Sequence, residues 1–112
     1  MKAFSRTKTA KIIKRMGGKL SYTPLATSIA ITGGYAICNP KTELYDDGSV
    51  NDPDFVLLRE DVNDTRIIGV PRPAHDDIIV YTDPDSGTIS TYWVDELIGS
   101  DTHTWRVSVR QQ

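Results

Sequence analysis

The chain has 112 residues, of which 38% are hydrophobic and 25% charged, a composition that fits one domain with one modest core. No window approaches the ~18 apolar residues of a membrane span, and the N-terminus lacks the apolar segment of a secretory signal, so we expect the chain to stay in the cytoplasm where it is made. The single cysteine, Cys38, excludes an intrachain disulfide and is expected to be a small core residue.

Charge is distributed unevenly along the chain. Residues 1–20 contain seven basic residues and no acid, a net charge of +7, whereas residues 21–112 contain six bases and fifteen acids, a net charge of −9. A basic segment joined to an acidic body indicates either two different roles for the two parts or a contact between the arm of one subunit and the body of the next. We therefore divide the chain into a basic arm, residues 1–18, and a β domain, residues 19–112.

The arm is predicted to be helical, because residues 5–16 contain no Gly or Pro. Ile12 and Ile13 precede Met16 by four and three positions, which predicts one narrow apolar face. Gly17 and Gly18 follow, and we expect a left-handed C-cap there. The residues predicted to contact a neighbouring subunit or partner are Lys8, Lys11, Lys14 and Arg15 of the arm, together with Arg59 and Arg72 of the β domain.

From Lys19 onward, short runs rich in β-branched and aromatic residues alternate with turn formers, which predicts a mainly β fold: a small antiparallel β-barrel or sandwich. Asp83–Gly87 has the composition of a hairpin turn, and Gly33–Gly34 indicates a tight turn. The expected strands are 19–23, 27–32, 34–39, 55–60, 66–69, 77–82, 88–94 and 104–110, the last with clear alternation of apolar and polar residues.

Two segments interrupt the strands. Residues 39–54, NPKTELYDDGSVNDPD, consist mostly of turn formers and acids, and predict a long mobile loop. Their oxygen ligands lack the spacing of an EF-hand, so a solvated acidic loop tip is preferred over a Ca²⁺ site. The two prolines of segment 70–73 predict an extended crossing between the β-halves.

No arrangement of residues indicates catalysis. The adjacent acids Asp76–Asp77 and Asp95–Glu96 would point to opposite faces of a strand, and His75 and His103 lie in predicted loops. The sequence contains no GxSxG, GxxxxGK[ST], GxGxxG or CxxC pattern. We therefore predict no enzyme activity and no catalytic, cofactor-binding or metal-binding residues.

Nucleic-acid binding is a second class of function to weigh. A β-face could offer stacking platforms, but the acidic β domain disfavours phosphate, and packing in the core or a subunit interface is preferred. One short basic helix offers no geometry for reading bases. The aromatic residues in question are Trp93, Trp105, Tyr22, Tyr35, Tyr81 and Tyr92.

The C-terminal half carries a recognisable order of elements. The runs FVLLREDV (55–62), TYWVDEL (91–97) and TWRVSVR (104–110) are joined by a Pro-containing crossing, an acid before a strand, a Gly turn and an acidic linker. Over roughly residues 17–112 this pattern resembles the head-to-tail joining proteins of long-tailed bacteriophages, also called head-closure or stopper proteins. The acidic loop 39–54 has no counterpart that we can match.

The resemblance implies a β-barrel of the virion neck that assembles as a six-fold or twelve-fold ring, below the portal or adaptor and above the tail terminator or tail tube. It would close the DNA-filled head, lie near packaged DNA, and dock the tail, without enzymatic activity, cofactor or membrane. Alternatives are a tail terminator or tail-tube subunit of the same virion, and a nucleic-acid-binding β-barrel. The acidic residues expected to face the channel are Glu43, Asp46, Asp47, Asp52 and Asp54.

Overall fold

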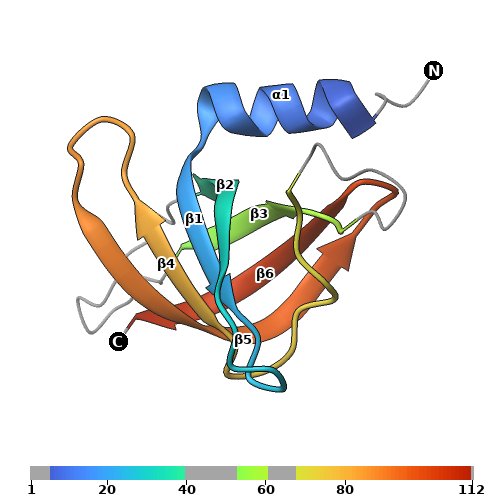
Figure 1. The fold of residues 1–112 in the computed structure, drawn as a ribbon, viewed down its shortest axis with the longest axis vertical. Helices are drawn as coiled ribbons and strands as arrows, with labels where there is room; N and C mark the ends of the chain where they lie inside the picture. Colours follow the sequence, from blue (N-terminus) through green and yellow to red (C-terminus); the bar gives the residue numbers. More distant parts are fainter. Residues whose placement is uncertain (1–5, 40–52, 61–67, 112) are drawn as a thin grey trace, which may run out of the picture.

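The computed structural model describes residues 6–39, 53–60 and 68–111, and it places one helix on a closed antiparallel β-barrel (Figure 1). The strand order is β1-β2-β3-β6-β5-β4, and β4 pairs back with β1. This confirms the predicted mainly β fold with an N-terminal helix. The elements are α1 (Arg6–Met16), β1 (Gly18–Thr23), β2 (Ile31–Asn39), β3 (Asp54–Leu58), β4 (Ile78–Thr82), β5 (Ile89–Ser100) and β6 (Thr104–Gln111).

Aromatic side chains fill much of the barrel interior. The ring of Phe55 is fully buried, and the rings of Tyr81 and Tyr92 meet it edge-on at centroid distances of 5.1 Å. In β6 the alternation predicted from the sequence holds, with Trp105, Val107 and Val109 facing this core. Cys38 is half-buried against the same core, and burial raises the pKa of its thiol.

One strand of the barrel replaces two that were predicted. The expected strands 27–32 and 34–39 are a single strand, β2, which begins at Ile31. Gly33 lies inside it with a φ of 80°, where the register between β1 and β2 shifts. The prediction of a tight turn at Gly33–Gly34 was wrong, because the left-handed glycine accommodates a bulge within the strand.

The other boundary errors also involve irregular pairing. β5 continues to Ser100 instead of ending at residue 94, since one register shift against β6 accommodates Asp95, Glu96 pairs with Ser108, and a second shift follows between Leu97 and Gly99. Of the expected strand 66–69, only residues 68–69 are described, and they are not in a strand. The neighbouring Val70 forms a single bridge with Arg59, just beyond β3.

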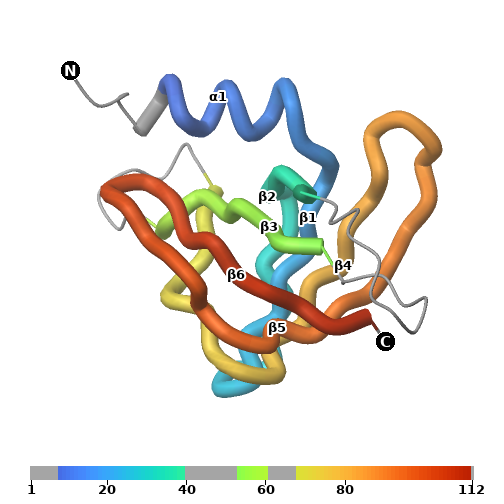
Figure 2. Tube along the Cα trace, turned by 180° about the vertical axis from the view of Figure 1, so that it is seen from behind, coloured from blue at the N-terminus to red at the C-terminus, as the bar shows by residue number. Residues whose placement is uncertain are grey.

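The helix lies against the outside of β2 and β3, as both views show (Figures 1 and 2). Neither Gly17 nor Gly18 has a positive φ, so the predicted left-handed C-cap was wrong. These glycines instead permit close approach: a Cβ at Gly17 would lie 2.1 Å from the Ala36 carbonyl oxygen. The predicted three-residue apolar face is also corrected, since only Ile13 is buried, while Ile12 and Met16 are 36% and 68% exposed.

Candidate functional site

The basic residues of the helix form one exposed surface. The side chains of Lys8, Lys11, Lys14 and Arg15 are all exposed on α1. The Lys14 Nζ lies 5.6 Å from the centre of the Tyr35 ring, a cation–π distance that helps hold the helix on β2. Lys14 and Arg15 lie in the last turn, where positive charge is favoured by the helix dipole. Four of the six predicted contact residues therefore lie together.

The other two predicted contact residues lie elsewhere. The Arg59 guanidinium is stacked 4.1 Å from the Trp105 ring centre and donates a hydrogen bond to the Asp101 carbonyl oxygen. The Arg59 guanidinium therefore already has partners in its own chain, and its contacts hold the β5–β6 turn. Arg72 is exposed at a bend in the segment that precedes β4.

A groove separates α1 from the barrel. We call it the helix groove; its volume is about 400 Å³. Its floor includes Ile37 and Val56, which are cross-strand partners on the outer surface of β2 and β3. The alternation of side chains along β3 places Phe55 and Leu57 in the core and therefore turns Val56 outward. The lining residues are Thr9, Ile12, Ile13, Ile37, Val56 and residues 101–104.

The β5–β6 turn forms the far wall of the helix groove. The Asp101 carboxylate accepts hydrogen bonds from the backbone amides of His103 and Thr104, both at 2.8 Å. Burial raises the pKa of Asp101, but these donors more than offset it, so the pKa lies below the usual value. His103 and Asp101 share the groove, yet the carboxylate is used to fix the turn.

The opposite end of the barrel is organised by a buried carboxylate. Asp77 is 2% exposed and accepts hydrogen bonds from the Tyr22 hydroxyl at 2.5 Å and from the amides of Leu25 and Ala74 at 2.8 and 2.9 Å. Burial, followed by the hydrogen bond and negative charge of Asp77, raises the pKa of Tyr22 strongly. One carboxylate therefore joins β1, the β1–β2 connection and the segment before β4.

The β1–β2 connection exposes apolar side chains. We call residues 24–30 the apolar loop. Leu25 and Ile29 are 61% and 71% exposed. The Leu25 amide donates to Asp77, as described above. Within the loop, the Ser28 amide donates to the Pro24 carbonyl at 2.9 Å, and Ser28 has a φ of 56°. The loop thus holds a defined conformation while presenting two large apolar groups to solvent.

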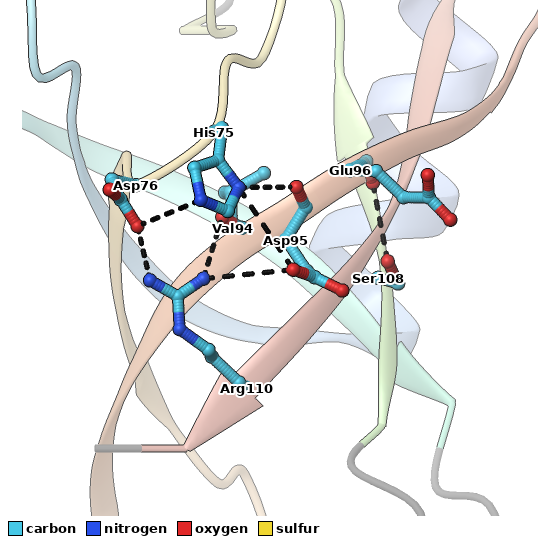
Figure 3. A network of polar contacts seen from close by, with 7 residues as sticks. All are labelled: His75, Asp76, Val94, Asp95, Glu96, Ser108 and Arg110. Carbon is cyan, nitrogen blue, oxygen red and sulfur yellow. Dashed lines mark hydrogen bonds and ion pairs between the residues drawn. The ribbon is translucent and has the colours of Figure 1, made fainter.

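A surface network lies at the same end of the barrel (Figure 3). Arg110 donates a hydrogen bond to the Asp76 carboxylate and lies 3.7 Å from that of Asp95. The His75 Nδ1 donates to the Asp95 carbonyl at 2.8 Å, while its Nε2 is 3.4 Å from the Asp76 carboxylate. The hydrogen bond from Arg110 lowers the pKa of the Asp76 carboxyl. Asp76 has a φ of 71° and lies just before β4. The network therefore ties the segment before β4 to β5 and β6.

The predicted channel-facing residues have two outcomes. Glu43, Asp46, Asp47 and Asp52 lie outside the described residues. Asp54 does not belong to a solvated loop tip: it is the first residue of β3, is 3% exposed, and forms an ion pair with Arg106 at 3.0 Å. The prediction for Asp54 is corrected, because its carboxylate is occupied in the barrel wall.

The two histidines lie in different surroundings. The His75 side chain is 63% exposed on the surface, and His103 shares its groove with a carboxylate already bonded to the turn. Within residues 6–39, 53–60 and 68–111, no three His, Cys, Asp or Glu side chains gather as metal ligands. The same residues contain no helix long and apolar enough to cross a membrane.

Sequence reasoning missed the helix groove, the buried Asp77 and the Arg110 network. The adjacency of Asp76 and Asp77 before a strand was visible, but it did not indicate which carboxylate is buried. Comparison of the chain with family models, with curated proteins and with solved structures finds no match. The resemblance to head-closure proteins remains a hypothesis based on the order of elements.

Proposed function

We propose that this protein is a structural subunit of a bacteriophage neck, which closes the DNA-filled head below the portal or adaptor and provides a docking surface for the tail. The observation that carries the proposal is a closed barrel with an exposed basic helix outside it. Every described strand has a hydrogen-bonded neighbour on each side, so no described strand presents a whole free edge to a partner. The helix, the loops and the outer side chains are therefore the main surfaces offered to partners.

The distribution of charge supports assembly with acidic partners. The exposed cations of α1 belong to a segment with a net charge of +7, and the rest of the chain has a net charge of −9. Opposite charges on two surfaces increase the rate of association and suppress wrong pairings. A ring of identical subunits, six-fold or twelve-fold, supplies an acidic neighbour at high local concentration.

The same geometry fits the related alternative of a tail terminator or tail-tube subunit, which only the partner distinguishes. It offers less support to a nucleic-acid-binding barrel. Single-strand binders stack bases on exposed aromatic rings. Of the candidate stacking residues, Trp93 and Tyr35 are half-buried, while four are buried: Tyr22, Tyr81, Tyr92 and Trp105.

The deciding experiment is co-sedimentation of the purified protein with DNA-filled, portal-bearing heads that lack tails. We expect the protein to bind these heads and to reduce leakage of DNA from them. A second protein tests the contribution of the arm. With all four arm cations replaced by Gln, it should bind the heads more weakly, and its binding should lose the dependence on salt concentration. The four cations are Lys8, Lys11, Lys14 and Arg15. Heads that ignore the wild-type protein would contradict the proposal.

Deletion of residues 43–52 tests the acidic loop separately. We expect the deleted protein to keep its thermal transition and to reduce the yield of infectious particles in a completion assay. A deletion protein that folds and gives an unchanged particle yield would remove the loop from the proposed mechanism.

A further inference from the structure

The apolar loop has the properties of a preformed contact. Residues 24–30, PLATSIA, contain no charged group. Leu25 and Ile29 are 61% and 71% exposed, although two hydrogen bonds fix the backbone: the Leu25 amide donates to the buried Asp77 carboxylate, and the Ser28 amide donates to the Pro24 carbonyl. Because the conformation is already set, little ordering opposes burial of these side chains against another surface.

The helix groove has the properties of a complementary receptor. Ile12, Ile13, Ile37 and Val56 make much of its lining, and Ile12 is still 36% exposed. A volume of about 400 Å³ lies within the range that holds a small ligand or a few side chains. An apolar groove and an apolar loop of this kind are therefore matched in chemistry.

The two features lie at opposite ends of the barrel, with α1 at the top and the loop between β1 and β2 at the bottom in both views (Figures 1 and 2). Their charges are also opposite. Beside the groove are four arm cations and the anion Asp101. Beside the loop, the Leu25 amide donates to the Asp77 carboxylate, and the adjacent Asp76 shares the Arg110 guanidinium with Asp95. Glu96, the next residue of β5, is exposed.

We infer that the occupant of the helix groove is the apolar loop of a second copy of this chain. Charge complementarity selects this occupant: docking brings the loop end of one copy, where three acids and Arg110 sum to −2, towards the helix end of another, where four cations and Asp101 sum to +3. The inference rests on the proposed function, for which it supplies the contact between subunits.

The contact joins two different surfaces, so it is heterologous. Each copy that donates its loop keeps an open groove at its other end, and addition continues from copy to copy. Such a contact gives a ring where the rotation per copy closes and a filament where it does not.

Disulfide trapping tests the contact directly, because Cys38 is the only cysteine in the chain. In a Cys38→Ala background, Ile29→Cys and Ile12→Cys proteins are mixed at high concentration and oxidised. We expect a covalent dimer in the mixture, several-fold above either protein alone. Ile89→Cys, 67% exposed at the β4–β5 turn, is the matched control and should give only background with either partner.

A mixing experiment tests the same contact without cysteines. Leu25→Glu/Ile29→Glu removes the loop surface, and Ile12→Glu introduces a charge into the groove; circular dichroism checks that both proteins fold. Each variant alone should sediment as a monomer, and the mixture should form a dimer and nothing larger, because one intact loop and one intact groove remain.

Two results would overturn the inference: a mixed disulfide no more abundant than the Ile89 control, or a dominant disulfide between two Ile29→Cys copies, which indicates a two-fold contact. If the protein binds tailless heads but gives no mixed disulfide, another protein occupies the groove and only this inference fails. If the mixed disulfide forms and heads are ignored, the inference stands and the proposed function fails.

Discussion

The two ends of the barrel are held together by different physical means. At the helix end, Gly17 and Gly18 allow backbone to lie against backbone, and Ile13 is buried beneath α1. At the loop end, the buried Asp77 carboxylate and the Arg110 network make directed polar contacts. The first arrangement is sensitive to added volume and insensitive to pH, whereas the second is sensitive to the loss of a single acceptor.

The largest expected effect comes from Asp77→Ala. It leaves the Tyr22 hydroxyl and two backbone amides without their acceptor, and each such buried donor costs roughly 1–3 kcal/mol. With partial recovery by water, we expect the free energy of unfolding in urea to fall by about 4 kcal/mol. Glu96→Ala removes an exposed carboxylate near the same end and should change it by less than about 0.5 kcal/mol.

The double variant Tyr22→Phe/Asp77→Ala sharpens this result. Tyr22→Phe removes the hydroxyl that Asp77→Ala leaves without an acceptor. The double variant should therefore lose less free energy of unfolding than the sum of the losses in the two single variants. Strict additivity would show that the Tyr22–Asp77 hydrogen bond makes no contribution to the loop end.

Gly17→Ala should have the next largest effect, at the helix end. Its Cβ would lie 2.1 Å from the Ala36 carbonyl oxygen, a backbone atom that cannot swing away. We expect a loss of roughly 1–3 kcal/mol in urea unfolding, as α1 is forced off the barrel. Gly34→Ala is the matched control, because the nearest atom to its Cβ is 3.7 Å away on Leu20. Equal losses of unfolding free energy in Gly17→Ala and Gly34→Ala would contradict the proposal that close backbone packing holds the helix end.

The smallest effect concerns pH at the loop end. The hydrogen bond from Arg110 lowers the folded-state pKa of Asp76. The interaction therefore stabilises the fold above the ordinary aspartate pKa, about 3.9, and this contribution is lost as the pH falls through the lowered value. In Arg110→Gln, NMR titration should show the Asp76 pKa rising towards its ordinary value, and the acid sensitivity of stability should decrease.

Asp83 provides the internal control for that titration. Its pKa is lowered by the backbone amides of Ser86 and Asp85 within its own turn. It should titrate identically in the wild-type and Arg110→Gln proteins. A parallel rise at Asp83 would indicate a general change of structure and would remove the support for a specific Arg110–Asp76 pair.

The elements that could be predicted from sequence are those with local patterns. Strand 104–111 follows from alternation, and the 83–87 turn from its Pro and Gly. The errors arose where the signal depends on a partner strand. Gly33 indicates a turn by itself but is a bulge opposite β1. Asp95 and Glu96 indicate a linker, but Asp95 lies at a register shift opposite β6 and Glu96 pairs with Ser108.

The candidate site was predicted only in its charges. The cations of α1 are exposed as a helical face should be, yet the groove beneath them depends on how closely Gly17 and Gly18 seat the helix. Likewise, Asp77 is buried because Tyr22 and Leu25, more than fifty residues earlier, converge on it. Contacts between such distant positions carry no periodic pattern in the sequence.

The position of β6 in the barrel sets the order of events during synthesis. β6 lies between β3 and β5, and among the six described barrel strands it is the last to leave the ribosome. Until residues 104–111 emerge, β3 and β5 each have an unpaired edge, and Trp105, Val107 and Val109 are missing from the core. The nascent chain therefore completes its barrel in a late, single step, with the β1–β2 and β4–β5 hairpins formed beforehand as local structure.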